Sequence, residues 1–205
     1  MYDVTMKNII IDATPMIVIF CVILVTTRLM YLKNTHRRFV LWKEVSNLIF
    51  VVYLLLLFEL VSNTESGSYG VNLIPFKEMF RYATDSLAFF YNTVGNMLIF
   101  IPFGFFISNY IEIKKTGQIT LALLVISLSI ESTQYFIGRA FDIDDIILNV
   151  LGGITGFLLY SLWRKIKKFL PKFMNSNWFN NIICVIFVVL AFLFFCDFFG
   201  WGFIK

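Results

Sequence analysis

Six long apolar runs, separated by short charged stretches, limit most strongly what this chain can fold into. They lie at Thr14–Leu32, Val45–Val61, Tyr91–Ile111, Ile119–Ile137, Ile146–Trp163 and Asn181–Phe199. About 20 apolar residues in an α-helix cross the hydrocarbon core of a bilayer, and each run approaches that length. The runs are continuous and do not alternate between apolar and polar residues, which favours helices over a β-barrel. The sequence therefore predicts an all-α, polytopic integral membrane protein of about six transmembrane helices, forming a single domain over residues 1–205.

The composition excludes an ordinary soluble domain. Only 15% of the residues are charged and 59% are hydrophobic, whereas soluble domains are about 25% charged. The net charge of +4 comes mainly from short loops between apolar runs, so it indicates membrane topology and not nucleic-acid binding. The three cysteines lie inside apolar runs and the single histidine in a basic loop. We therefore expect no disulfide framework, no metal site built on Cys or His and no cofactor, and the bilayer is the expected partner.

The positions of Lys and Arg predict the orientation. With the N-terminus outside, twelve of the 17 lie on the inner side and five on the outer side. The inner set is Arg28, Lys33, Arg37, Arg38, Lys43, Lys114, Lys115, Arg164, Lys165, Lys167, Lys168 and Lys172, and the outer set is Lys7, Lys77, Arg81, Arg139 and Lys205. Because cytoplasmic loops carry the excess of basic residues, we expect both termini outside.

This orientation brings eleven polar residues to the outer face or the outer third of the membrane. They are Glu59, Asn72, Asn92, Asn96, Glu131, Gln134, Arg139, Asp142, Asp144, Asp145 and Asn149. Such residues are costly in a bilayer and usually serve a function there. Glu131 ends one run while Asp145 and Asn149 begin the next, so the short loop between the runs forces them together. We therefore expect an outward-facing polar pocket for a ligand.

The stretch VNLIPFKEMFRY, at residues 71–82, precedes the third run. It predicts an amphipathic piece at the membrane surface. Its apolar side chains, expected to enter lipid, are Leu73, Ile74, Phe76, Met79 and Phe80, while Lys77, Glu78 and Arg81 stay in water.

Purely structural roles explain part of this pattern. Aspartates before an apolar run cap helix N-termini, and Arg139 pairs with one of them in this interpretation. Gly152, Gly153 and Gly156 allow another helix to approach closely, and Pro102 kinks the third run.

Three functional interpretations remain open from the residues alone. The carboxylates could hold a hard cation, or divide general acid and base work in a hydrolase or transferase. They could also grip a polar ligand at the outer leaflet, with Arg139 taking a phosphate or carboxylate. The sequence contains no Ser–His pair, Cys–His pair or HExxH motif that would specify an enzyme.

Four motifs resemble the VanZ-like family. They are NLIPF at Asn72–Phe76, N-x-x-x-NMLIFIPFG at Asn92–Gly104, IESTQ at Ile130–Gln134 and RAFDIDDIILNVLGG at Arg139–Gly153. The resemblance covers a core of residues 45–163. Residues 1–44 and 164–205 look like an added first and sixth span with basic cytoplasmic loops.

The family is named for a bacterial protein linked to resistance to teicoplanin and related lipoglycopeptides. The resemblance therefore implies a multi-pass protein of a bacterial plasma membrane that reduces susceptibility to such antibiotics. It would bind an amphiphile, either the drug or a cell-wall lipid, or alter the cell surface at the outer leaflet. An intramembrane enzyme that modifies an envelope lipid or polymer, and a structural partner of another membrane protein, are the alternatives.

Overall fold

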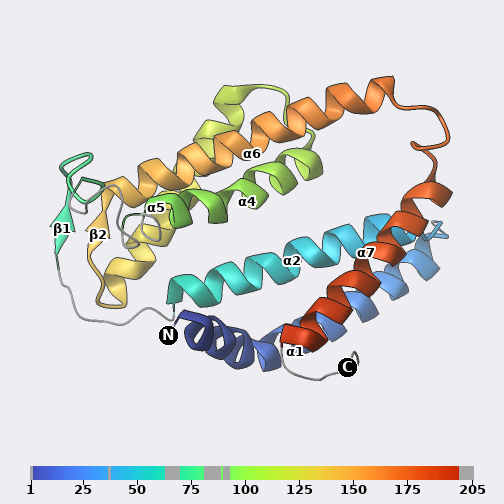
Figure 1. Cartoon of the computed structure of the whole chain (residues 1–205), viewed down its shortest axis with the longest axis horizontal. Helices are drawn as coiled ribbons and strands as arrows, with labels where there is room; N and C mark the ends of the chain where they lie inside the picture. The colour runs from blue at the N-terminus through green and yellow to red at the C-terminus, as the bar shows by residue number, and fades with distance from the viewer. Residues whose placement is uncertain (1, 37, 63–69, 81–88, 90–92, 199–205) are drawn as a thin grey trace. The chain divides into compact units, whose positions relative to one another are not determined.

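The structure is a computed structural model that describes residues 2–36, 38–62, 70–80, 89 and 93–198. These residues form six helices and one pair of very short strands (Figure 1). The helices are α1 (Tyr2–Thr35), α2 (Leu41–Ser62), α4 (Gly95–Ile111), α5 (Thr116–Phe136), α6 (Ile143–Phe169) and α7 (Asn177–Phe198). The strands are β1 (Val71–Asn72) and β2 (Phe141–Asp142). The predicted all-α class is therefore confirmed.

Five of these helices are long and apolar enough to cross a membrane. Their apolar segments are Ile10–Thr35, Leu41–Leu60, Thr116–Phe136, Ile143–Phe169 and Asn177–Phe194. In the α7 segment no residue is buried inside the protein, as expected where side chains contact lipid. The remaining apolar helix, α4, has 17 described residues. These features define a multi-pass helical membrane protein.

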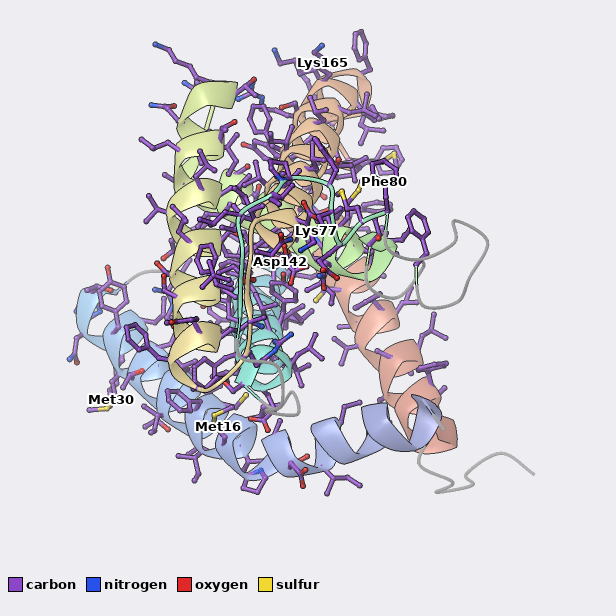
Figure 2. All side chains as sticks on the ribbon, turned by 90° about the vertical axis from the view of Figure 1, so that its left-hand side faces the viewer. Met16, Met30, Lys77, Phe80, Asp142 and Lys165 are labelled. Atoms are coloured by element: carbon purple, nitrogen blue, oxygen red, sulfur yellow. The ribbon has the colours of Figure 1, made fainter. Side chains whose placement is uncertain are left out.

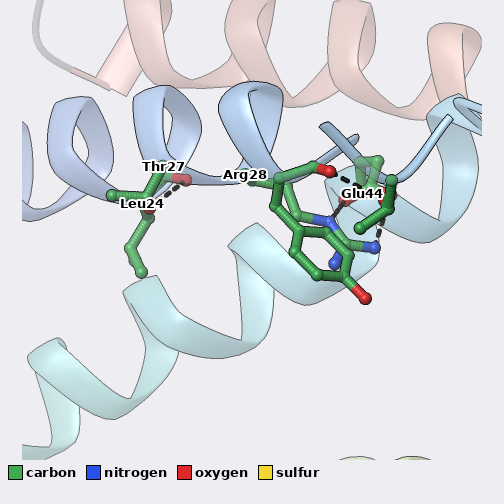
Figure 3. A network of polar contacts seen from close by, with 6 residues as sticks. Leu24, Thr27, Arg28 and Glu44 are labelled. Atoms are coloured by element: carbon green, nitrogen blue, oxygen red, sulfur yellow. Dashed lines mark hydrogen bonds and ion pairs between the residues drawn. The ribbon is translucent and has the colours of Figure 1, made fainter. Parts of the chain in front are cut away.

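The chain divides into two compact units, and the first contains residues 1–55 and 167–205. In this unit Arg28 and Glu44 form a two-pronged ion pair, with Nε–Oε2 and Nη2–Oε1 distances of 2.8 and 3.0 Å (Figure 3). This geometry joins α1 to α2. The Trp42 backbone N–H donates to Asn181 Oδ1 at 3.0 Å and its indole N–H to Asn177 Oδ1 at 3.1 Å, which joins α2 to α7.

The second unit contains residues 56–166, and within it α4 and α6 meet backbone to backbone. A Cβ atom on Gly104 would lie 1.9 Å from the carbonyl oxygen of Gly153. On Gly156 it would lie 2.1 Å from the carbonyl oxygen of Ile101. Only glycine fits at these two contacts. The glycines therefore allow α4 and α6 to approach each other closely, as their spacing in the sequence predicted. The helix continues through Pro102.

The two strands join the residues before α4 to the connection between α5 and α6. They are parallel, with Val71 opposite Phe141 and Asn72 opposite Asp142. The backbone N–H of Phe141 also donates to the Gly70 carbonyl at 3.0 Å. The stretch expected to be an amphipathic piece is therefore a short strand followed by a turn over residues 74–80. In Figure 1 the pair β1 and β2 lies at the left, beside the end of α5 and the start of α6.

Candidate functional site

A cavity of about 370 Å³ lies in the second unit, where four helix ends meet. Its walls come from the last turns of α2, the turn at residues 78–79, the start of α4, the end of α5 and the start of α6. The lining residues are Leu57, Leu60, Glu78, Met79, Thr93, Asn96, Ile99, Phe100, Ile130, Glu131, Gln134, Arg139, Asp142, Asp144, Asp145, Leu148 and Asn149. This volume falls in the range of sites for small molecules or for part of a larger one, about 300–1,000 Å³.

Glu131 is the buried acid of the α5 wall, with only 1% of its surface exposed. Its Oε2 accepts a hydrogen bond from the backbone N–H of Asp142 at 3.1 Å. Gln134 lies three residues further along the helix and so on the same face. With its amide nitrogen toward Glu131, Gln134 donates to Oε1 at 2.8 Å while its oxygen accepts from Arg139 Nη1. Glu131 therefore contacts the loop at Asp142 and faces the protein interior.

Asp142 caps α6. Its Oδ1 accepts the backbone N–H of Asp144 at 2.9 Å, two residues on, which is the usual geometry of an N-cap aspartate. The same oxygen accepts from the Asn72 side-chain amide at 2.9 Å. The capping role expected for an aspartate of this loop is therefore confirmed for Asp142.

Asp144 holds the turn that follows β1. Its side chain is buried and accepts backbone N–H bonds from Phe76 at 2.5 Å, Glu78 at 2.8 Å and Met79 at 3.1 Å. Phe76 adopts a left-handed backbone conformation, with φ of 66°, which this carboxylate helps to fix. The main observed role of Asp144 is thus to position the turn.

Two further side chains of α6 connect it to its neighbours at the cavity. Asn96 of α4 donates to Asp145 Oδ1 at 2.6 Å. Asn149 donates to the buried Ser127 hydroxyl of α5 at 3.0 Å. Since Asp145 and Asn149 lie one turn apart, one face of α6 carries polar links to both adjacent helices.

The lining is strongly acidic. Among its described residues are five carboxylates, from Glu78, Glu131, Asp142, Asp144 and Asp145, and one guanidinium, from Arg139. Crowded carboxylates away from bulk water favour protons, cations or hydrogen-bond donors. In the described part of the chain, no three His, Cys, Asp or Glu residues are arranged so that they could hold a metal ion. Carboxylate oxygens accept hydrogen bonds, so the acidic lining suits a ligand that presents hydrogen-bond donors.

Of the eleven residues expected in the pocket, eight line this cavity and two others that the structure describes do not. Asn72 is not in the lining but bonds to Asp142. Glu59 is half-buried and also absent from the lining, because the α-helical turn of 100° per residue directs Leu57 and Leu60 inward and Glu59 aside. Asn92 lies outside the described residues.

Glu78 and Ser127 are among the residues at the site that were not predicted from the sequence. Glu78 was expected to stay in water, yet it is half-buried and lines the cavity. Ser127 lies one turn before Glu131, and this helical spacing was a readable signal.

The fold and the site together define a multi-pass, all-helical membrane protein with an acidic, amide-rich cavity at its helix ends. The VanZ/LLP1 family model matches residues 16–164, and the chain belongs to this family. It is similar to Protein VanZ of Enterococcus faecium, with 32% identity over 148 residues that cover 71% of this chain and 82% of the relative. No solved structure matches the chain.

The residues that the family model matches include most of the chain and every residue that lines the cavity. The match begins within α1, so the resemblance extends further toward the N-terminus than the motifs from residue 45 onward indicated. Helix α7 lies beyond the matched range.

Proposed function

We propose that this protein lowers the susceptibility of a bacterium to teicoplanin and related lipoglycopeptides by binding an amphiphile at the acidic cavity. The observation that carries the proposal is the composition of the cavity wall. Carboxylates and amides lie beside apolar side chains such as Leu57, Leu60 and Leu148 in a volume of about 370 Å³. Such a wall suits a ligand that has both a polar and an apolar part.

The polar part of the ligand follows from the charges. Carboxylates accept hydrogen bonds and do not donate them when ionised, so amino and hydroxyl groups fit this wall. A phosphate or carboxylate would meet Arg139 but also several like charges. The favoured amphiphile therefore presents amines or hydroxyls to the cavity, which holds both for a glycosylated drug and for a sugar-bearing cell-wall lipid.

The proposed orientation puts the cavity at the outer face of the plasma membrane, with both termini outside. The twelve-to-five distribution of basic residues supports it. The pairing of β1 with β2 adds that the connections before α4 and before α6 share one side of the membrane. An outer site would be open to a drug or to a cell-wall lipid without prior transport.

The experiment compares variants expressed in a susceptible bacterium at matched membrane levels. Glu131→Gln removes the buried carboxylate of the cavity while keeping its shape. Glu112→Gln is the matched control, because Glu112 is an exposed carboxylate just beyond the C-terminus of α4 and is not in the cavity lining.

We expect the native chain and Glu112→Gln to reduce teicoplanin susceptibility and Glu131→Gln to lose this effect. Vancomycin, which lacks the lipid tail, should act equally on all strains. Full protection by Glu131→Gln would contradict the proposal. A change in envelope lipids that depends on Glu131 would instead support a carboxylate-dependent enzyme.

A further inference from the structure

Residues 71–80, called here the interfacial wedge, contain two kinds of side chain. Glu78 and Met79 line the cavity. Five large apolar side chains of the same segment are exposed, and Phe80 keeps 74% of its surface accessible. These are Val71, Leu73, Ile74, Phe76 and Phe80. In the view of Figure 2, Phe80 lies at the outer edge of this segment. Large apolar side chains exposed together in so short a segment indicate a contact surface.

The wedge is held firmly to the start of α6. Asp144 accepts three of its backbone N–H groups, at 2.5–3.1 Å. Asn72 bonds to Asp142 at 2.9 Å, and β1 pairs with β2. These links fix the turn so that the apolar side chains of Phe76 and Phe80, whose ring centroids are 6.4 Å apart, form one patch.

The attachment also sets the depth of the wedge. Helix α6 is 27 residues long and apolar enough to cross the bilayer, so its first turn lies near a membrane–water boundary. A segment tied to that turn lies at the same level, where apolar side chains enter the boundary between headgroups and acyl chains. Lys77 is exposed on the same segment, and a lysine at this level reaches water or headgroups.

We propose that the interfacial wedge inserts its apolar side chains into the lipid leaflet beside the cavity, and that Asp144 is the positioning residue that sets its depth. The occupant of the patch is the acyl-chain region of membrane lipids. The proposal does not rest on antibiotic binding, so it can be tested apart from the proposed function.

The test uses single cysteines in the 205-residue chain, in which Cys21, Cys184 and Cys196 have been replaced by other residues. Leu73→Cys, Lys77→Cys and Phe80→Cys are spin-labelled and reconstituted into phosphatidylethanolamine–phosphatidylglycerol vesicles. For each spin label, the rate of collision with oxygen is compared with the rate of collision with a water-soluble nickel chelate. Oxygen concentrates among the acyl chains, whereas the chelate stays in water. Leu121→Cys provides the lipid reference, because Leu121 lies in α5 and is 65% exposed.

We expect labels at positions 73 and 80 to favour oxygen, as the label at 121 does, and the label at 77 to favour nickel. Adding Asp144→Asn should shift the label at 80 toward nickel and leave the label at 121 unchanged, which shows that the helices remain folded. Labels at 73 and 80 that favour nickel would overturn the insertion. Labels shielded from both reagents would also overturn it, because protein, such as a second copy, would then cover the patch. An unchanged depth in Asp144→Asn would overturn the positioning role.

Discussion

The carboxylate of Glu131 accepts a hydrogen bond from the backbone N–H of Asp142 at 3.1 Å. One buried acid near the end of α5 therefore closes the connection that leads into α6. The same side chain lines the cavity. The substitution Glu131→Gln separates the contribution of this side chain to folding from its contribution to function. It removes the carboxylate but retains an oxygen that accepts the Asp142 N–H.

Glu131→Gln should lose less stability than Glu131→Ala, because glutamine keeps one acceptor oxygen for the Asp142 N–H and only the acceptor of the Gln134 amide is lost. Alanine leaves the Asp142 N–H and the Gln134 amide without their acceptor, and an unsatisfied buried group costs about 1–3 kcal/mol. The unfolding temperatures of the native chain and of both variants are measured in detergent. Equal losses for the two substitutions would mean that the charge, and not the acceptor, is what the fold requires.

The pair Asn96–Asp145 should behave as a coupled unit. Asn96→Asp places a second carboxylate within 2.6 Å of the first, and like charges at this distance repel. Adding Asp145→Asn restores one carboxylate and one amide with the roles exchanged. Thermal unfolding should show a loss in the single variant and recovery in the double, with a coupling of about 0.5–3 kcal/mol. Purely additive effects would show that the hydrogen bond contributes nothing to stability.

Gly156→Ala should destabilise the protein, because the new Cβ would meet the Ile101 backbone oxygen at 2.1 Å. Backbone atoms cannot move aside as a flexible side chain can, and overpacking costs about 1–3 kcal/mol. Gly117→Ala is the matched control, since nothing lies within 4 Å of its Cβ position. The unfolding temperature should fall in the first variant and not in the second. Equal behaviour would contradict the close contact of α4 and α6.

Lys77 should be accessible from outside the cell and Lys168 should not. The reason is the excess of basic residues assigned to the inner side. Single cysteines at these two exposed positions, in the chain without native cysteines, are labelled on intact cells with a membrane-impermeant maleimide. We expect labelling at 77 alone, with both sites labelled after lysis. The reverse pattern on intact cells would invert the topology.

Local patterns in the sequence were enough for much of this architecture. The apolar runs predicted the helices, because the bilayer imposes length and composition on any span. Helical spacing placed Glu131 and Gln134 on one face. The short loop before α6 brought Asp142 to the helix N-terminus, where it acts as a cap.

Contacts between distant parts of the chain could not be predicted in this way. The parallel pairing of Asn72 with Asp142 joins residues 70 positions apart, and no local pattern encodes it. The same limit hid the role of Asp144, whose carboxylate is occupied by a turn more than 60 residues earlier. Glu78 was assigned to water for this reason, although that turn directs it to the cavity.

The central claim is that the acidic cavity acts as one unit in protection against lipoglycopeptides. The most direct test measures teicoplanin susceptibility in cells that carry Glu131→Gln, Asp145→Asn or both, at matched membrane levels. We predict that each single substitution removes most of the protection and that the double removes little more, because groups that share one task give non-additive losses. Protection that survives both single substitutions would contradict the account and leave these residues a role in folding alone.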